Sequence, residues 1–107
     1  MAKESWAQKY KIKIHLENCT DSIAYLGHHF DGRVFVDDTI TLAKGKGIFT
    51  QHKTLPQGIY VVYLPSKQYF DILIGKEQHF SVDAKVVDKQ VEAIKISGSK
   101  ESKVFQQ

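Results

Sequence analysis

Apolar and polar side chains alternate along the stretch that begins at Tyr10, and this alternation constrains the fold more than any other feature. The apolar positions are Tyr10, Ile12, Ile14 and Leu16, with lysine, histidine and glutamate between and after them. Successive side chains of a β-strand point to opposite faces. The pattern therefore predicts a strand with one dry and one solvated face, as in an antiparallel sheet that covers a core on one side.

Turn-forming residues divide the rest of the chain into further short strands. Asp31-Gly32 is the strongest hairpin signal, because a type I′ turn needs positive φ at both central residues. Lys44-Gly45-Lys46-Gly47 and Leu55-Pro56-Gln57-Gly58 are also typical turn sequences. The expected strands are 10–17, 22–30, 33–36, 39–42, 48–51, 59–64, 69–74, 78–83 and 93–97.

The spacing of these strands is that of β-sandwiches and barrels. No segment before Ser97 has a helical period. We predict an all-β fold, an antiparallel β-sandwich of about eight or nine strands, in which the continuously apolar segment 59–64 is a central strand covered on both faces. The segment 85–92 fits a loop, a ragged strand or a single helical turn.

The two ends of the chain differ from the domain between them. Residues 1–9 are expected to be a disordered lead-in, and residues 10–98 the β-sandwich domain. Ser99 is a suitable N-cap, so residues 99–107 are predicted to begin a C-terminal helix that leads into a further domain. No apolar stretch has the length of a membrane span, and the first residues lack the apolar core of a signal peptide. These features leave a cytoplasmic protein or a chain whose targeting segment has been removed.

Charge and cysteine content argue against several functions. The formal net charge is +3, and the lysines are spread along the chain between acidic residues. Nucleic-acid modules concentrate positive charge on one face, so no nucleic-acid partner is expected. The single cysteine, Cys19, rules out an intrachain disulfide, a cysteine zinc cluster and a Cys-x-x-Cys redox pair. We expect it to be a small, partly buried loop residue.

The histidines form no recognisable metal motif. Two of them are adjacent, and neighbours on a strand point to opposite faces and cannot both face one ion. The others lack the His-x-His or His-x₃-His spacing of metal-binding histidines. We therefore predict surface histidines and no metal site. The five histidines are His15, His28, His29, His52 and His79.

Carboxylates and glycines give no catalytic or cofactor-binding pattern either. Asp37-Asp38 is not followed by the further oxygen ligands of a calcium loop. Gly45-Lys46-Gly47 is too short for a phosphate-binding loop, and no Gly-x-Ser-x-Gly elbow occurs. The isolated carboxylates mark no general acid and base pair. We expect no catalytic, cofactor-binding or metal-binding residues; the isolated carboxylates are Asp71, Glu77 and Asp83.

Aromatic residues in the predicted strands keep a ligand-binding alternative open. Most strand tyrosines pack with a tethered hydroxyl, but Phe35 lies on the opposite face from Val34 and Val36 and is the best candidate for an exposed ring. An exposed ring suits a module that binds a glycan or another small ligand. Together with Lys11 and Lys13, it also allows a single-stranded nucleic-acid binder built on a barrel.

The order of strand and turn sequences resembles a known domain family. The matching segments run from Lys11-Ile12-Lys13-Ile14 to Ile96-Ser97-Gly98-Ser99 with Phe105. Between them lie Tyr25-Leu26-Gly27, Asp38-Thr39, Gly47-Ile48-Phe49, Leu55-Pro56-Gln57-Gly58-Ile59-Tyr60, Tyr69-Phe70-Asp71-Ile72-Leu73-Ile74 and Gln78-His79-Phe80-Ser81-Val82. Over residues 10 to 107 the chain is similar to an N-terminal β-domain of unknown function. That domain precedes a thioredoxin-like domain, of the alkyl hydroperoxide reductase and thiol-specific antioxidant type, in exported thiol-disulfide oxidoreductases of Gram-negative anaerobes.

The resemblance implies an accessory role without chemistry of its own. In such proteins the thioredoxin-like domain carries the Cys-x-x-Cys pair, and its thiolate attacks a disulfide. This chain has no second cysteine, so the resemblance transfers redox activity to none of its residues. It implies that the domain presents, orients or docks the catalytic domain of the same polypeptide. It also implies export to the periplasm or cell envelope, often as a lipoprotein.

Overall fold

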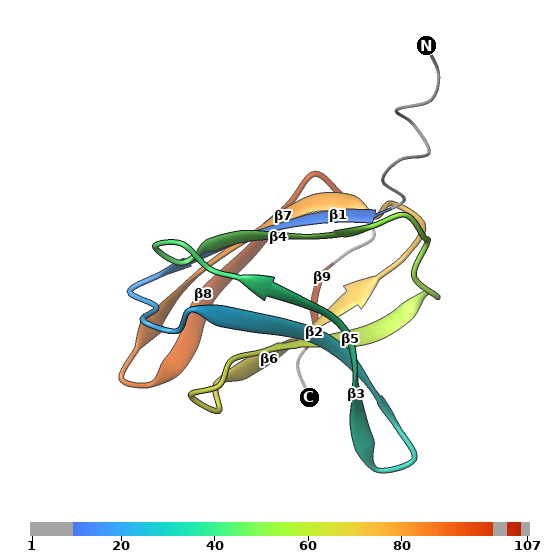
Figure 1. Cartoon of the computed structure of the whole chain (residues 1–107). Helices are drawn as coiled ribbons and strands as arrows, with labels where there is room; N and C mark the ends of the chain where they lie inside the picture. The colour runs from blue at the N-terminus through green and yellow to red at the C-terminus, as the bar shows by residue number, and fades with distance from the viewer. Residues whose placement is uncertain (1–9, 100–102, 106–107) are drawn as a thin grey trace.

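The computed structural model describes residues 10–99 and 103–105, which form nine strands (Figure 1). No helix occurs among these residues, and hence none that could cross a bilayer. The expected lead-in, residues 1–9, lies outside the described residues. The strands are β1 (Tyr10–Glu17), β2 (Ile23–Phe30), β3 (Arg33–Thr41), β4 (Lys46–Gln51), β5 (Gly58–Tyr63), β6 (Tyr69–Ile74), β7 (His79–Val87), β8 (Gln90–Ser97) and β9 (Lys103–Phe105).

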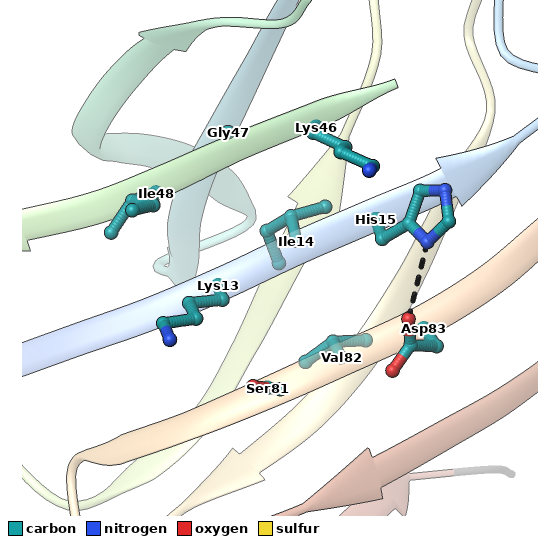
Figure 2. Close-up of a pocket in the computed structure, with 9 residues that line it drawn as sticks. All are labelled: Lys13, Ile14, His15, Lys46, Gly47, Ile48, Ser81, Val82 and Asp83. Atoms are coloured by element: carbon teal, nitrogen blue, oxygen red, sulfur yellow. Dashed lines mark ion pairs between the residues drawn. The ribbon is translucent and has the colours of Figure 1, made fainter. Parts of the chain in front are cut away.

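Two stacked sheets make up the domain, which confirms the predicted β-sandwich. The first sheet has the strand order β4-β1-β7-β8, and the second has the order β3-β2-β5-β6-β9. Every pair of neighbouring strands is antiparallel except β1 and β7, which are parallel. Part of the outward face of the first sheet is shown in Figure 2. The apolar segment 59–64 supplies most of β5, which lies in the middle of the second sheet, as predicted.

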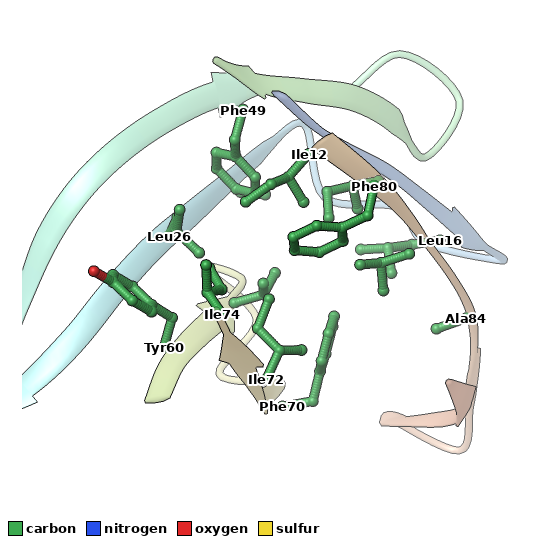
Figure 3. Packing of buried hydrophobic residues seen from close by; sticks show 14 of the residues in the cluster. Ile12, Leu16, Leu26, Phe49, Tyr60, Phe70, Ile72, Ile74, Phe80 and Ala84 are labelled. Carbon is green, nitrogen blue, oxygen red and sulfur yellow. The ribbon is translucent and has the colours of Figure 1, made fainter. Parts of the chain in front are cut away.

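The core lies between the inner faces of the two sheets (Figure 3). The four apolar positions of β1 are all buried, with exposed fractions of 2% or less, so the alternation predicted the inward face correctly. Burying a large aliphatic or aromatic side chain contributes about 1.5–3 kcal/mol, and this core is the main source of stability. The first sheet contributes Ile12, Leu16, Phe49, Phe80 and Ala84, and the second contributes Leu26, Tyr60, Phe70, Ile72 and Ile74.

A buried carboxylate ties the two sheets together at one edge. Asp38 of β3 is 9% exposed. Its Oδ2 accepts a hydrogen bond from the hydroxyl of Tyr10 at 2.9 Å. Its Oδ1 accepts from Nε2 of Gln51 at 3.1 Å and from the backbone N–H of Thr39 at 2.9 Å. Because a buried charge is tolerated only when hydrogen bonds satisfy it, these contacts fix β3 of the second sheet against β1 and β4 of the first.

The sequence-based boundaries differ most from the structure at β3 and at the turn between β7 and β8. The predicted strands 33–36 and 39–42 form one strand, β3, whose register with β2 shifts between Leu26 and Gly27, so that Asp37 is the extra residue. The uncertain segment 85–92 is the end of β7, a two-residue turn at Asp88 and Lys89, and the start of β8. Both turn residues have positive φ, at 50° and 64°, which is the geometry of a type I′ hairpin.

The predicted C-terminal helix is wrong over Lys103–Phe105, which form β9 on the edge of β6. Backbone pairing with β6 satisfies the hydrogen-bonding groups of these residues, whereas a very short helix leaves most of its groups without partners. The hydroxyl of Ser99, the expected N-cap, donates to Oε1 of Glu77 at 3.2 Å. The remaining residues of the predicted helix, 100–102 and 106–107, lie outside the described residues.

We predict that Tyr10→Phe lowers the free energy of unfolding by about 1–3 kcal/mol, because it removes the only donor to Oδ2 of the buried Asp38 carboxylate among the described residues. The matched control is Tyr63→Phe, because no hydrogen bond involves the Tyr63 hydroxyl in the described structure, and its ring stacks on Tyr25 at 4.8 Å. Its expected loss is below about 0.5 kcal/mol. Urea unfolding of both variants measures the difference, and equal losses would contradict the role given to Asp38.

A second prediction compares two glycines in hairpin turns. Gly32 and Gly45 have φ of 75° and 79°, so alanine at either position costs about 1–2 kcal/mol. A Cβ at Gly32 meets nothing within 4 Å, whereas a Cβ at Gly45 overlaps the carbonyl oxygen of Leu16. We expect Gly45→Ala to lose about 1–3 kcal/mol more than Gly32→Ala, because the backbone must shift. Chemical denaturation measures the free energy of unfolding of both variants. A similar loss in the two variants would show that the backbone at Leu16 moves without cost.

Candidate functional site

The five histidines do not meet at one point. His28 and His29 have opposite orientations, as predicted for neighbours on a strand. Nδ1 of His28 lies 2.7 Å from Oδ2 of Asp37, and His29 lines a depression on the outer face of the second sheet. Over the described part of the chain, no three His, Cys, Asp or Glu side chains gather as a metal site requires.

The outward face of the first sheet collects basic side chains in rows. The strand register places Lys11 beside His79, Lys13 beside Ser81 and His15 beside Asp83. Partner residues of neighbouring strands share a face, so these outward positions form one surface, which we call the basic face. In three adjoining rows it consists of Thr50, Lys11 and His79, then Ile48, Lys13, Ser81 and Ser97, then Lys46, His15, Asp83 and Lys95.

The three rows of the basic face carry an excess of positive charge. The sequence has 15 lysine and arginine residues and 12 aspartate and glutamate residues, a formal charge of +3. Four lysines and one carboxylate, Asp83, lie on the basic face. The formal charge of these three rows with neutral histidines is therefore +3. The next row on the same side of the sheet, Glu17, Lys85 and Glu92, contributes −1. The lysines are spread along the chain, as expected, but strand pairing brings four that are distant in sequence onto one surface.

A depression of about 560 Å³ lies at the centre of the basic face, between β4, β1 and β7 (Figure 2). Lys13, Lys46 and Ile48 stand around it, and Nδ1 of His15 lies 3.3 Å from Oδ1 of Asp83. Both side chains of this pair are about half exposed, at 45% and 55%. No hydroxyl or thiol of the described residues hydrogen-bonds to the His15 ring, and an activated nucleophile needs such a contact. The arrangement is suited to attracting anions rather than to bond-making chemistry.

A second surface lies at the end of the β2–β3 hairpin, which extends beyond the sandwich at the lower right of Figure 1. The turn residues Asp31 and Gly32 both have positive φ, which confirms the predicted type I′ turn. β5 pairs with β2 only from Tyr25 to His28, so the end of the hairpin has no neighbouring strand on that side. We call its exposed apolar side chains the hairpin tip; they are Phe30, Val34, Phe35 and Val36.

The exposed ring predicted at Phe35 is confirmed, and the exposure of this segment extends further than alternation predicts. Phe35 is 43% exposed, and Val34 and Val36 on the other face are exposed to a similar degree, at 42% and 49%. Phe30 is more exposed than any of them, at 66%. Period-two alternation predicts one buried face only where a second layer covers the strand. The hairpin tip has no such layer, so both of its faces meet solvent.

Aromatic and histidine rings support the base of the hairpin tip. Phe35 stacks on His28 with centroids 5.8 Å apart, and Phe30 packs against Phe35 at 6.2 Å. His28 in turn meets the edge of Tyr60 at 6.2 Å. Burial, with a further contribution from the Asp37 charge, raises the pKa of Tyr60 to about 12, so its hydroxyl stays protonated and donates to the carbonyl of Pro56. These contacts hold Phe35 in place while leaving its outer side open.

Cys19 lies half-buried in the β1–β2 loop, in agreement with the prediction. Burial raises the pKa of the Cys19 thiol above its usual range, and Sγ lies 4.0 Å from Oδ2 of Asp21. Because the thiolate is the reactive form, a raised pKa lowers the nucleophilicity of this residue at neutral pH. Burial beside the Asp38 carboxylate likewise raises the pKa of Tyr10, which keeps it protonated as a hydrogen-bond donor.

A family model described as a domain of unknown function, DUF4369, matches residues 10–105. The match begins with the first residue of β1 and ends with the last residue of β9, so it covers both sheets and both surfaces. No curated protein and no solved structure matches the chain significantly. The family model covers nearly the entire chain, and the chain therefore belongs to the DUF4369 family of domains of unknown function.

Proposed function

We propose that this domain is a non-catalytic interaction domain of a larger thioredoxin-like thiol-disulfide oxidoreductase, and that the hairpin tip is its contact surface for protein. The observation that carries the proposal is the exposure of two phenylalanines and two valines on a projecting two-stranded element. Exposed apolar groups gathered in one place mark interaction sites on soluble proteins. Aromatic side chains are also enriched at the centres of protein–protein interfaces.

The backbone of β3 supports a protein partner further. β3 is an edge strand of the second sheet, so alternate residues direct N–H and C=O groups away from β2. An extended segment of a partner can pair with such an edge, while Val34 and Phe35 contact its side chains on the two faces. The Asp37 irregularity interrupts the register at the base of the hairpin, which limits this pairing to the hairpin tip.

The oxidoreductase part of the proposal places the redox chemistry outside this domain. The chain has one cysteine, and the pKa of its thiol is raised, whereas thiol-disulfide exchange needs a thiolate and usually a second thiol. The order of segments that resembles the N-terminal domain of exported oxidoreductases supports a thioredoxin-like partner domain in the same polypeptide. We further propose a periplasmic or cell-envelope location on the same ground.

A specific observation favours a glycan-binding alternative on the outer face of the second sheet. Tyr69 is 65% exposed at the edge of a depression of about 520 Å³ that is also lined by Tyr63 and Asp71. An exposed aromatic ring at the edge of a depression is suited to stacking on a sugar.

The hairpin tip is tested in the full-length protein with the double variant Phe30→Ser/Phe35→Ser. We expect kcat/KM for reduction of a disulfide in an unfolded protein substrate to fall about tenfold or more, because loss of an aromatic anchor typically costs over 1 kcal/mol of binding. Reduction of a small disulfide should not change. Ile48→Ser, which removes an exposed apolar residue from the basic face, is the matched control. A reading frame that encodes no thioredoxin-like domain, or equal loss on both substrates, would refute the proposal.

The glycan alternative predicts binding that depends on Tyr69. Loss of a stacked aromatic ring is expected to weaken glycan binding about tenfold or more, since each such contact is worth about 1–3 kcal/mol. A glycan array probed with the wild-type domain, Tyr69→Ala and Phe30→Ala measures this. Binding that disappears in Tyr69→Ala and persists in Phe30→Ala supports the alternative, and an array without any hit removes it.

A further inference from the structure

We propose that the basic face is a docking surface for an anionic phospholipid bilayer. In three adjoining rows the face presents four lysines, two histidines and one carboxylate, a formal charge of +3, and the next row on the same side of the sheet adds Glu17, Lys85 and Glu92. Lysines near an anionic leaflet each add to membrane attraction when several reach it together. The proposal rests on this charge distribution and is independent of the function proposed for the hairpin tip.

The geometry brings the lysines to one plane. Lys11 and Lys13 project from β1 in the middle of the first sheet, Lys46 from β4 on one side and Lys95 from β8 on the other. Neighbouring strands are about 4.8 Å apart, a spacing shorter than the length of a lysine side chain. The ammonium groups can therefore reach separate lipid phosphates while their aliphatic stems lie along the sheet.

The one carboxylate within the three rows of the basic face already has a partner. Asp83 faces Nδ1 of His15 at 3.3 Å and is paired across the strands with Lys95. The repulsion that an unpaired carboxylate would exert on an anionic surface is therefore reduced. Lys11 and Lys13 have no carboxylate opposite them in either neighbouring strand, since their cross-strand partners are Thr50, His79, Ile48 and Ser81.

The composition of the face favours a lipid surface over nucleic acid. Modules for single-stranded nucleic acid place aromatic rings among the basic residues for base stacking. The basic face has no Phe, Tyr or Trp, and its central apolar side chain is Ile48, which is 43% exposed. An aliphatic side chain surrounded by lysines matches the boundary between lipid headgroups and acyl chains.

The basic face and the hairpin tip lie on opposite sides of the domain. The basic face belongs to the first sheet, and the hairpin tip belongs to the second sheet on the opposite side of the core (Figure 1). A domain that rests on a bilayer through the basic face therefore keeps the hairpin tip away from the lipid, accessible to a protein.

The test is a flotation assay of the 107-residue chain with two kinds of vesicle. One is phosphatidylcholine alone, and the other contains about 30% phosphatidylglycerol, a fraction that gives a negative surface potential. We expect binding to the anionic vesicles at about 0.02 M salt, and at least a tenfold weaker binding at about 0.5 M salt, where the Debye length is only a few ångströms. Equal binding to both vesicles, or none to either, overturns the proposal.

Paired substitutions locate the surface. Lys13→Gln/Lys95→Gln removes two charges from the basic face and is expected to weaken vesicle binding about tenfold or more. Lys53→Gln/Lys67→Gln removes the same charge from exposed positions elsewhere and should change binding less than about threefold. Unfolding curves confirm that both variants fold. Equal losses in the two variants refute a localised surface, and binding to a single-stranded oligonucleotide without binding to vesicles refutes the lipid assignment.

Discussion

The buried carboxylate of Asp38 is the interaction on which the arrangement of this domain depends most directly. It lies in β3, at the edge of the second sheet, yet its hydrogen-bond donors Tyr10 and Gln51 belong to the first sheet. The two layers are therefore joined at this edge by directional polar contacts in addition to apolar packing. Because these contacts anchor β3 at Asp38, the hairpin beyond them projects from a fixed base, and its exposed residues are presented in a defined direction.

Much of the fold was predictable because local chemistry and the final structure agree. Alternation identified the buried residues of β1, and Asp31-Gly32 identified the β2–β3 turn. The Asp38 network was not predictable, because its donors lie 28 and 13 residues away and the residue itself has the character of a turn former. The prediction of a C-terminal helix was wrong over Lys103–Phe105 for a related reason. The edge of β6 gives Lys103–Phe105 backbone partners that a very short helix lacks.

The candidate surfaces show the same division between local and long-range information. Phe35 was found because alternation within one strand placed it opposite two valines, but its exposure results from the absence of a covering layer. The basic face was missed because its lysines come from three strands that are separated by tens of residues. Their alternate positions, as at Lys11 and Lys13, were visible in the sequence. Only the strand register shows that they belong to the same surface as Lys46 and Lys95.

The parallel pairing of β1 with β7 has a consequence for the time course of folding. β1 is the first strand of the described residues but lies inside the first sheet, and its residue Lys11 pairs with His79. Closing a loop of that length is an entropic cost that precedes the gain from the contact, and folding slows as such distant pairings increase. During synthesis, β1 emerges before both of the strands that flank it. It can pair first with β4, because β7 is synthesised later. One of its edges then stays open until nearly the whole domain has emerged, which makes this strand the point where a nascent chain is most exposed to mispairing.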